Sequence, residues 1–285
     1  MHIGIGLPSI IPDTSGRAII DWGRAAEQLG FSSVATIGRL TYPALEELVS
    51  LSAVAAVTER IGLLTNILIA PARDPVELAK QAASLDVLSE GRLTLGLAVG
   101  WREDDFIVTG RPYNARGRRF NEDLEVMGRV WAGEKVRGSW KSVSPTPTNG
   151  RSVPILIGGG VPAVFERAAK WGIGFTAGGA PPDATSELFN QARAAWAAAG
   201  REGQPRLVAL AYYGYGPGAR ERAAGYLGDY YGEYGAAMAA AIPVSPDELR
   251  ATVSAFEEIG TDELILDPTG ASMDQLEGLA EAVLA

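Results

Sequence analysis

The stretch "GRLTLGLAVGWREDDF", residues 91–106, joins an apolar segment directly to an aromatic residue and a cluster of charge. Residues 93–99 are apolar except for Thr94 and Gly96, so neither face of the predicted strand is polar. A strand that is apolar on both faces is covered on both sides, as in the parallel sheets of α/β proteins. A buried strand does not by itself explain the residues that follow it, which are Gly100, Trp101 and then the charged residues Arg102, Glu103, Asp104 and Asp105.

Seven further apolar segments of this kind alternate with longer segments of helical periodicity. The helical segments carry start signals, such as Asp74-Pro75 and Ser245-Pro246, which place an N-cap before a proline at the first helical position. Eight strands with helices between them predict one (β/α)8 TIM barrel, an α/β fold, over residues 1–285. A doubly wound sheet also alternates, but the first strand here ends in "GLPSIIPDTSG", which is not a dinucleotide-binding glycine loop. The eight predicted strands are residues 2–7, 32–37, 61–70, 93–99, 154–158, 172–177, 206–213 and 262–267.

Two segments interrupt the alternation. Residues 133–153 are rich in Gly, Ser, Pro and Thr, and we expect an excursion before strand five there. Residues 212–243 are rich in tyrosine and alanine, which predicts an extended helical segment after strand seven with a partly exposed aromatic face. This segment either packs against the barrel or serves as a lid or substrate contact.

Composition excludes several classes of function. The 285 residues include no cysteine and one histidine, His2, which excludes disulfides, cysteine nucleophiles and multi-histidine metal sites. We therefore expect no metal. A formal charge of −9 argues against nucleic acid as a partner. No apolar stretch is long enough to cross a bilayer, and the start "MHIGIGLP" does not resemble a signal peptide. We expect a cytoplasmic protein without a membrane partner.

The predicted fold explains the opening stretch. In a (β/α)8 barrel the active site lies at the carboxyl ends of the strands. Strand four is apolar because it lies between the barrel interior and the helices, and it ends in Gly-Trp and charge because that end faces the site. The alternative is an ordinary polar loop in which Arg102 pairs with a neighbouring acid.

The stretch "IGGGVPAVFERAAKWG", residues 157–172, is a strand, three glycines and a helix start. Gly158, Gly159 and Gly160 can present backbone N–H groups at a helix N-terminus, where geometry and dipole favour a phosphate; a plain tight turn is the alternative. In "GFTAGG", Thr176 and Gly178 are expected to complete the cradle, with the Thr176 hydroxyl as a donor.

Four segments resemble the luciferase-like monooxygenase family, the flavin- or deazaflavin-dependent enzymes of the bacterial luciferase superfamily. They are residues 58–92, 92–134, 153–179 and 260–283. The resemblance implies a (β/α)8 barrel, a homodimer, and a flavin-type cofactor (coenzyme F420 in preference to FMN) whose phosphate binds at Gly158–Gly160. It also implies a non-prolyl cis peptide between Asn66 and Ile67, in a bulge behind the cofactor ring. Thr65, Asn66 and Ile67 are therefore expected cofactor-binding residues; a simple bulge or a buried asparagine is the alternative.

This chain departs from the family pattern at two positions. Many relatives carry an aspartate where this chain has Gly38, and the sugar-phosphate dehydrogenase branch uses a carboxylate where this chain has Trp101. Both proton-transfer groups are therefore missing. Arg39, Asn66 and Trp101 become the catalytic candidates: Arg39 to bind an anionic or carbonyl group, and Trp101 to wall the ring pocket. Arg39 and Trp101 can equally be structural.

Other charged residues have two interpretations each. One arginine among Arg111, Arg116, Arg118 and Arg119 can reach an anionic cofactor tail, or all four can form a salt-bridged helix face. Asp267, at the end of strand eight, is either a site residue or a carboxylate that fixes a loop.

We expect an oxidoreductase in which reduced coenzyme F420 exchanges hydride with an activated C=C, C=N or carbonyl group of a small molecule. The first alternative is an oxygen-activating monooxygenase that receives reduced FMN from a separate reductase. The second is a flavin-binding protein without turnover.

Overall fold

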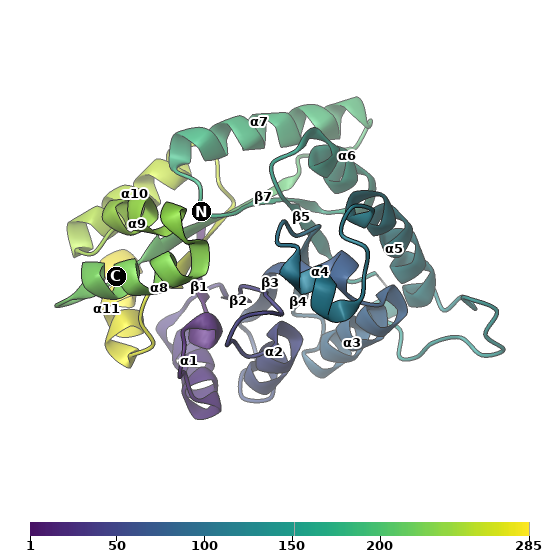
Figure 1. Cartoon of the computed structure of the whole chain (residues 1–285), viewed down its shortest axis with the longest axis horizontal. Coiled ribbons are helices and arrows are strands. Elements are labelled where there is room, and N and C mark those ends of the chain that lie inside the picture. The colour runs from purple at the N-terminus through teal and green to yellow at the C-terminus, as the bar shows by residue number, and fades with distance from the viewer. Residues whose placement is uncertain (151, 285) are drawn as a thin grey trace.

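Eight parallel strands close into a barrel in the computed structural model, which describes residues 1–150 and 152–284 (Figure 1). Each strand pairs with the next along the chain, and β8 pairs with β1 through His2–Glu263 to Ile5–Leu266. The strands are β1 His2–Gly6, β2 Ser33–Thr36, β3 Gly62–Ile69, β4 Leu93–Ala98, β5 Ile155–Gly158, β6 Gly174–Ala177, β7 Arg206–Tyr213 and β8 Glu263–Pro268.

All eight predicted strands are confirmed, each with bounds within two residues of those expected. Their apolar character on both faces follows from the architecture. One set of side chains fills the barrel interior, where Leu64, Leu156, Val208 and Ile265 form a cluster with Ala35. The alternate set faces the helices and belongs to a larger core. Burial on both faces leaves no position for polar alternation.

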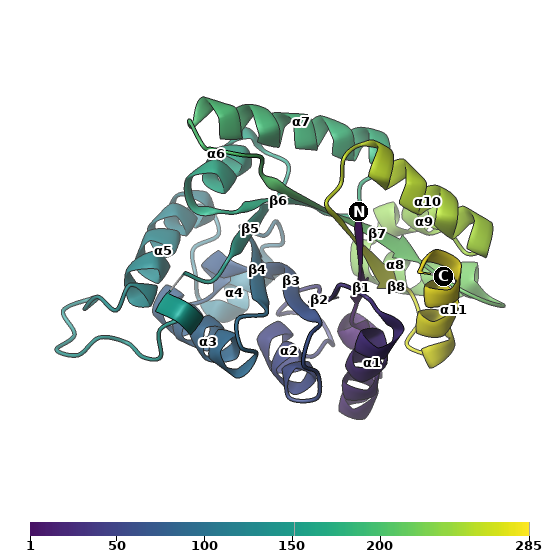
Figure 2. The same cartoon turned by 180° about the vertical axis from the view of Figure 1, so that it is seen from behind.

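Helices surround the strands, as Figure 2 shows from behind. The predicted start signals are confirmed: Asp74 accepts hydrogen bonds from Val76 and Glu77, and Ser245 forms a capping box with Glu248. The helices in the described residues are α1 Gly16–Leu29, α2 Glu47–Ala55, α3 Pro75–Leu88, α4 Asp104–Thr109, α5 Arg116–Trp131, α6 Pro162–Trp171, α7 Pro182–Ala198, α8 Ala219–Tyr231, α9 Glu233–Ala241, α10 Pro246–Glu258 and α11 Met273–Val283.

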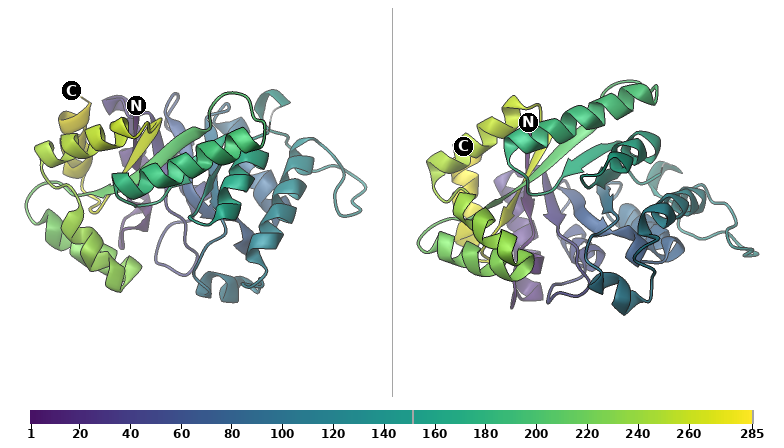
Figure 3. Two further views of the ribbon diagram at one scale, coloured as in Figure 1. Left: turned by 90° about the horizontal axis from the view of Figure 1, so that it is seen from above. Right: turned by 45° about the horizontal axis from the view of Figure 1, so that its top comes forward.

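The excursion before strand five is confirmed. It leaves the end of α5 and projects from the barrel as a long loop that carries the exposed Trp140 (Figure 3).

The tyrosine-rich segment differs from the expectation of one helix with an exposed aromatic face. It forms two helices, α8 and α9, separated at Gly232, whose φ is +64°. Tyr226 and Tyr230 are buried, while Tyr234 is 78% exposed. Both helices lie in front of the strands in Figure 1 and behind them in Figure 2, at the same end of the barrel as α4. Tyr226 and Tyr230 face inward because α8 covers the carboxyl end of the barrel, and the exposed Tyr234 of α9 agrees with the expectation of a partly exposed aromatic face.

Among the described residues, no helix combines the length and the apolar character needed to cross a bilayer. Within the same residues, no group of three or more His, Cys, Asp or Glu side chains is arranged to hold a metal ion.

Candidate functional site

A cavity of about 500 Å³ opens at the carboxyl ends of the strands. Its volume falls within the range of roughly 300–1,000 Å³ that is usual for small-molecule sites. The cavity brings together nearly all the site residues expected from the sequence. Those that line it are Arg39, Asn66, Ile67, Trp101, Gly158, Gly159, Gly160, Thr176 and Gly178.

The peptide bond between Asn66 and Ile67 is cis, as the family resemblance predicts. The register between β3 and β4 shifts between Thr65 and Leu68, so the strand bulges at this point. The Thr65 hydroxyl is fully buried and donates to the Gly96 carbonyl at 2.9 Å, which ties Thr65 to the barrel wall and not to the cavity.

Asn66 offers a hydrogen-bond donor to the cavity. Its Oδ1 accepts a hydrogen bond of 2.7 Å from the Thr176 hydroxyl, which fixes the orientation of the amide. Its Nδ2 is buried and has no partner among the described residues. A buried donor without a partner is costly, so this amide is available to donate to a group in the cavity. The Thr176 hydrogen is engaged with Asn66, so the expected donation from Thr176 to a phosphate is not what this structure shows.

The glycine run ends β5 and leads into α6. Gly159 has φ +133°, a conformation that L side chains rarely adopt. Helix α6 begins after Val161 with no side-chain cap and no acidic residue in its first turn. Gly159, Gly160 and Val161 are exposed and line the cavity. The positive end of the helix dipole therefore faces the cavity without a neutralising group, as an anion site requires.

Gly38 lies where the structure leaves no room for a side chain. A β-carbon at this position would collide with the Glu47 carboxylate and the Ile67 carbonyl. Glu47 is buried beneath it and is paired with Arg73 at 2.6 Å. Burial raises the pKa of Glu47 to about 7, and the Arg73 charge opposes this rise.

Arg39 lines the cavity but is already engaged. Its Nη2 pairs with Asp104 at 2.9 Å, and its guanidinium lies 5.7 Å from the Tyr230 ring centroid. Asp104 also accepts from Thr41, and these contacts hold the pKa of Asp104 below its usual value against the effect of burial. Trp101 lines the mouth of the cavity, where its side chain is 64% exposed.

Arg102 does not pair with an acid in the described part of the chain. The alternative of a polar loop in which Arg102 pairs with a neighbouring acid is therefore wrong. Its Nη2 donates to the Tyr230 carbonyl at 2.6 Å, and its guanidinium lies 4.3 Å from the Tyr230 ring centroid. Nη1 is buried without a partner in the same residues. Arg102 thereby joins the loop after β4 to helix α8 across the cavity.

One arginine of the 111–119 group reaches the cavity. Arg116 donates to the Gly100 carbonyl at 2.9 Å, stacks on Tyr113 and has no acidic partner among the described residues. Arg111 and Arg119 bond the Pro71 carbonyl, and Arg118 lies beside Glu122 on the exposed helix face. The salt-bridged helix face is confirmed for Arg118, while contact of an arginine with a cofactor tail stays a prediction, for which Arg116 is placed at the cavity.

Sequence reasoning missed several residues of the cavity. Asp105 is fully buried, and its Oδ1 accepts from the Leu40 and Thr41 amides and the Thr41 hydroxyl. Tyr212, Tyr230 and Tyr231 come from the ends of β7 and α8. The signal for the tyrosines was their concentration in residues 212–243, although nothing there indicated which of them face inward.

Asp267 lies at the end of β8, beside Tyr212 in the register. It is 2% exposed, packs against Gly6, and its Oδ2 has no hydrogen-bond partner in the residues described. Burial raises the pKa of Asp267 to about 8.

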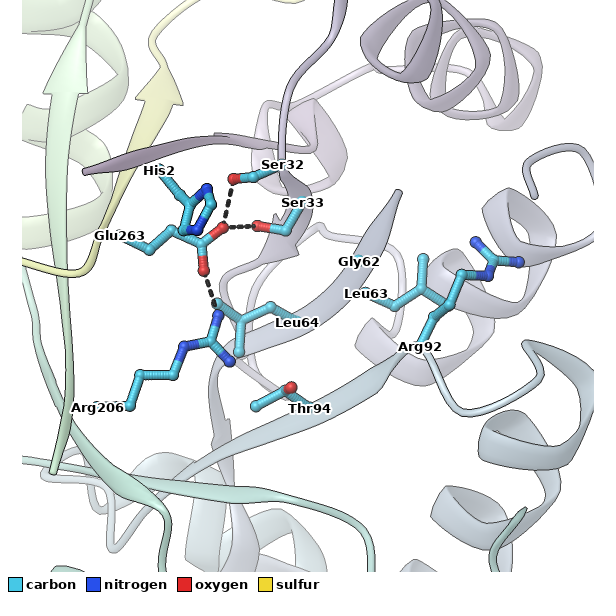
Figure 4. A pocket seen from close by; sticks show the side chains of 10 residues that line it. All are labelled: His2, Ser32, Ser33, Gly62, Leu63, Leu64, Arg92, Thr94, Arg206 and Glu263. Carbon is cyan, nitrogen blue, oxygen red and sulfur yellow. Dashed lines mark hydrogen bonds and ion pairs between the residues drawn. The ribbon is translucent and has the colours of Figure 1, made fainter. Parts of the chain in front are cut away.

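A second cavity, of about 300 Å³, lies at the amino end of the barrel (Figure 4). The buried Glu263 carboxylate accepts from the hydroxyls of Ser32 and Ser33 at 2.6 and 2.7 Å and pairs with Arg206. His2, the first residue of β1, lines this cavity. Both Glu263 carboxylate oxygens have partners, so this carboxylate is fully paired within the protein.

Comparison with known proteins defines the family. Residues 2–267 match the model of the luciferase-like monooxygenase family, and the chain belongs to that family. The (β/α)8 barrel and the cis peptide agree with what the sequence resemblance implied.

Two curated relatives illustrate how similar the family members are. An uncharacterized protein of Mycobacterium tuberculosis is 36% identical over 179 residues, 58% of this chain and 61% of that protein. An F420-dependent glucose-6-phosphate dehydrogenase of Microbacterium testaceum is 30% identical over 186 residues, 59% of this chain and 55% of that protein. The chain thus matches about three fifths of the length of these relatives.

Solved structures confirm the fold over the whole chain. A monooxygenase from Streptomyces bottropensis matches with a TM-score of 0.82 at 23% identity, covering 100% of this chain and 99% of its own. An F420-dependent secondary alcohol dehydrogenase in complex with an F420-acetone adduct matches with a TM-score of 0.83 at 16% identity, covering 99% and 98%. These likenesses show the fold, and the family is that of the luciferase-like monooxygenases.

Proposed function

We propose that this protein binds coenzyme F420 in the carboxyl-end cavity and exchanges hydride between the cofactor and a small organic substrate. The observation that carries the proposal is the presence, in one cavity, of an uncapped helix N-terminus and an orphaned buried amide. The first suits a phosphate and the second suits a polar edge of a planar ring. These two features fit a nucleotide-like flavin or deazaflavin.

Each residue group would contribute one kind of binding. The backbone N–H groups of Gly159, Gly160 and Val161 would hold the phosphate, and Asn66 Nδ2 would donate to the ring. Arg116, without an acidic partner in the described residues, would meet a carboxylate of the deazaflavin tail, a group that FMN lacks. When bound, a reduced deazaflavin supplies hydride and reacts poorly with oxygen.

Coenzyme F420 is preferred over FMN on two grounds. A 30% identical relative is named as F420-dependent. Arg116 and Arg102 add cationic groups beyond what one phosphate needs. FMN-dependent oxygen chemistry is the competing function for the same site.

We further propose that the protein forms a homodimer, as the family resemblance implies, and that it is located in the cytoplasm.

A parallel titration of cofactor-free protein with F420 and with FMN, followed by fluorescence, tests the proposal. Tighter binding of F420, followed by anaerobic oxidation of its reduced form by an organic acceptor, is the expected result. Binding of FMN alone would move the assignment to a monooxygenase with a partner reductase. Binding of neither would remove the proposal, and binding without turnover over a broad acceptor panel would favour a carrier.

A further inference from the structure

Hydride transfer to a polar double bond creates a need for a proton. When hydride reaches a carbonyl carbon, the C=O π pair moves to oxygen, and the resulting oxyanion must be protonated. The residues at the two family positions for proton transfer, Gly38 and Trp101, cannot do this, because neither carries an ionisable group. The donor has to be another group that lines the cavity.

Few groups in the cavity can release a proton. Its titratable lining residues are Asp105, three arginines and the tyrosines Tyr212, Tyr230 and Tyr231. Arginine does not deprotonate in proteins. Asp105 anchors the loop after β2 through three hydrogen bonds to its Oδ1, and its Oδ2 has no partner in the described residues. Because Asp105 has this structural role, we take the tyrosines as the candidate donors.

Two of the tyrosines form a hydroxyl pair. The oxygens of Tyr212 and Tyr231 lie 2.8 Å apart, and their rings meet edge to face with centroids 6.0 Å apart. Two hydroxyls carry two hydrogens, and one hydrogen forms the bond between them. Within the described residues neither oxygen has another partner, so the second hydrogen is free to be donated into the cavity.

The pair is protonated at neutral pH. Burial raises the pKa of Tyr212 well above its usual value and raises that of Tyr231. The Asp267 carboxyl beside Tyr212 acts in the same direction when it is ionised. The hydroxyl pair therefore keeps its hydrogens until an acceptor with a more basic oxygen is formed next to it.

We propose that the Tyr212–Tyr231 hydroxyl pair is the catalytic proton donor, and that the substrate is consequently a carbonyl or conjugated carbonyl compound. The inference rests on the proposed hydride transfer. In the step, the carbonyl carbon, or the β-carbon of a conjugated carbonyl compound, would gain hydride from the reduced cofactor. The π pair displaced onto the carbonyl oxygen would form an O–H bond with a tyrosine proton, and the tyrosine pair would regain that proton from solvent. The acceptor gains two electrons and two protons in total, and the cofactor is oxidised.

The test compares Tyr212→Phe and Tyr231→Phe with Tyr226→Phe as the matched control. Tyr226 is buried in the same cluster, with its ring centroid 6.2 Å from that of Tyr212, but it does not line the cavity. F420 dissociation constants and melting temperatures are measured first for all four proteins. The single-turnover oxidation of reduced F420 by an enone, a quinone and an imine is then followed by absorbance.

The single-turnover rate with enone or quinone should fall about 100-fold or more, with unchanged F420 affinity, in the variant that lacks the donating hydroxyl, Tyr212→Phe or Tyr231→Phe, and should not fall in Tyr226→Phe. Rates within threefold of wild type in both pair variants would overturn the inference. So would turnover of the imine alone, or no turnover of a carbonyl acceptor by a protein that binds F420. Failure of the wild-type protein to bind F420 would instead overturn the proposed function.

A second readout does not need the cofactor. 4-Nitrophenol is an aromatic oxyanion analogue, and the free hydroxyl hydrogen should favour its bound phenolate form and lower its apparent pKa. We expect this shift in wild type and Tyr226→Phe and its reduction in the two pair variants. Absence of binding, or an equal shift in all four proteins, would contradict the inference.

Discussion

Buried charged groups have hydrogen-bond partners at the amino end of the barrel and partly lack them at the carboxyl end. At the amino end, Glu263 is surrounded by two serine hydroxyls and Arg206, and every carboxylate oxygen is satisfied. At the carboxyl end, Asp267 is equally buried, and its Oδ2 lacks a partner in the described residues. The Asn66 amide and the Arg102 guanidinium also carry unpaired nitrogens there. Asn66 and Arg102 line the cavity, so their unpaired nitrogens are available to a ligand, whereas Asp267 is a buried carboxyl outside the cavity lining.

The largest effect should come from replacing Asp267 by asparagine. Because the pKa of Asp267 is raised to about 8, the folded state binds a proton that the unfolded state releases near pH 4. This contribution to stability is fully present below pH 4 and is lost as the pH rises to 8. Relative to Asp267→Asn, wild type should lose on the order of 5 kcal/mol over this range, at up to ~1.4 kcal/mol per pH unit.

Denaturant unfolding of both proteins at intervals from pH 4.5 to 8.5 measures this difference, because their other ionisable groups are shared. Parallel stability curves would mean that Asp267 has a partner that the structure lacks. Such a result would remove the contrast between the two ends of the barrel.

The next effect concerns the amino end. Glu263→Ala leaves two buried serine hydroxyls and Arg206 without their acceptor, and should lower the free energy of unfolding by about 3 kcal/mol. Affinity for F420 should not change, since the network lies at the opposite end from the cofactor cavity. A variant that keeps its stability but loses cofactor binding would reverse the roles assigned to the two ends.

A smaller effect, on binding, is expected at the bulge. Asn66→Ala removes the orphaned donor and should weaken F420 binding about tenfold, or about 1.4 kcal/mol, the contribution of one hydrogen bond in a buried site. Thr94→Val, at the amino-end cavity, is the matched control and should leave affinity unchanged. Equal affinities in a calorimetric titration of Asn66→Ala and wild type would show that the amide does not contact the cofactor.

The smallest effect is expected at the mouth of the cavity. Trp101 is 64% exposed, so Trp101→Ala should change the free energy of unfolding by less than about 0.5 kcal/mol. If Trp101 walls the ring, F420 affinity should fall severalfold in a fluorescence titration. A large loss of stability would assign Trp101 to the core instead.

The strands and their order were predictable because buried parallel strands have a distinctive composition, as in residues 93–99 and 206–213. The cis peptide at Asn66–Ile67 was predicted from the family resemblance alone. The glycine run was predicted as a phosphate site from the resemblance and also from its backbone N–H groups at a helix N-terminus. These features are local in sequence, so one chain is enough to locate them.

Contacts between distant residues could not be predicted. Arg39 and Arg102 both follow the end of a strand, and nothing in the sequence indicates that they have different partners. In the structure Asp104 pairs with Arg39, whereas no acid in the described residues pairs with Arg102. Tyr212 in β7 and Tyr231 at the end of α8 are 19 residues apart, and they meet because α8 folds back over the end of the barrel. The partners of Glu263 lie 57, 230 and 231 residues away in the sequence.

The central claim is that the uncapped N-terminus of α6 binds the phosphate of a flavin-type cofactor. The most direct measurement compares the dissociation constants of F420 and of its phosphate-free riboside in wild type, Gly160→Asp and Gly160→Asn. Gly160 has open space for a side chain, so the variants differ in charge at the cradle and not in packing. In wild type the riboside should bind about 100-fold more weakly, the equivalent of two charge-assisted hydrogen bonds. The riboside also lacks the carboxylate tail, so the contribution of the phosphate is taken from Gly160→Asp, which should reduce the preference at least about tenfold relative to Gly160→Asn. Equal affinities of F420 and the riboside for wild type would contradict the account.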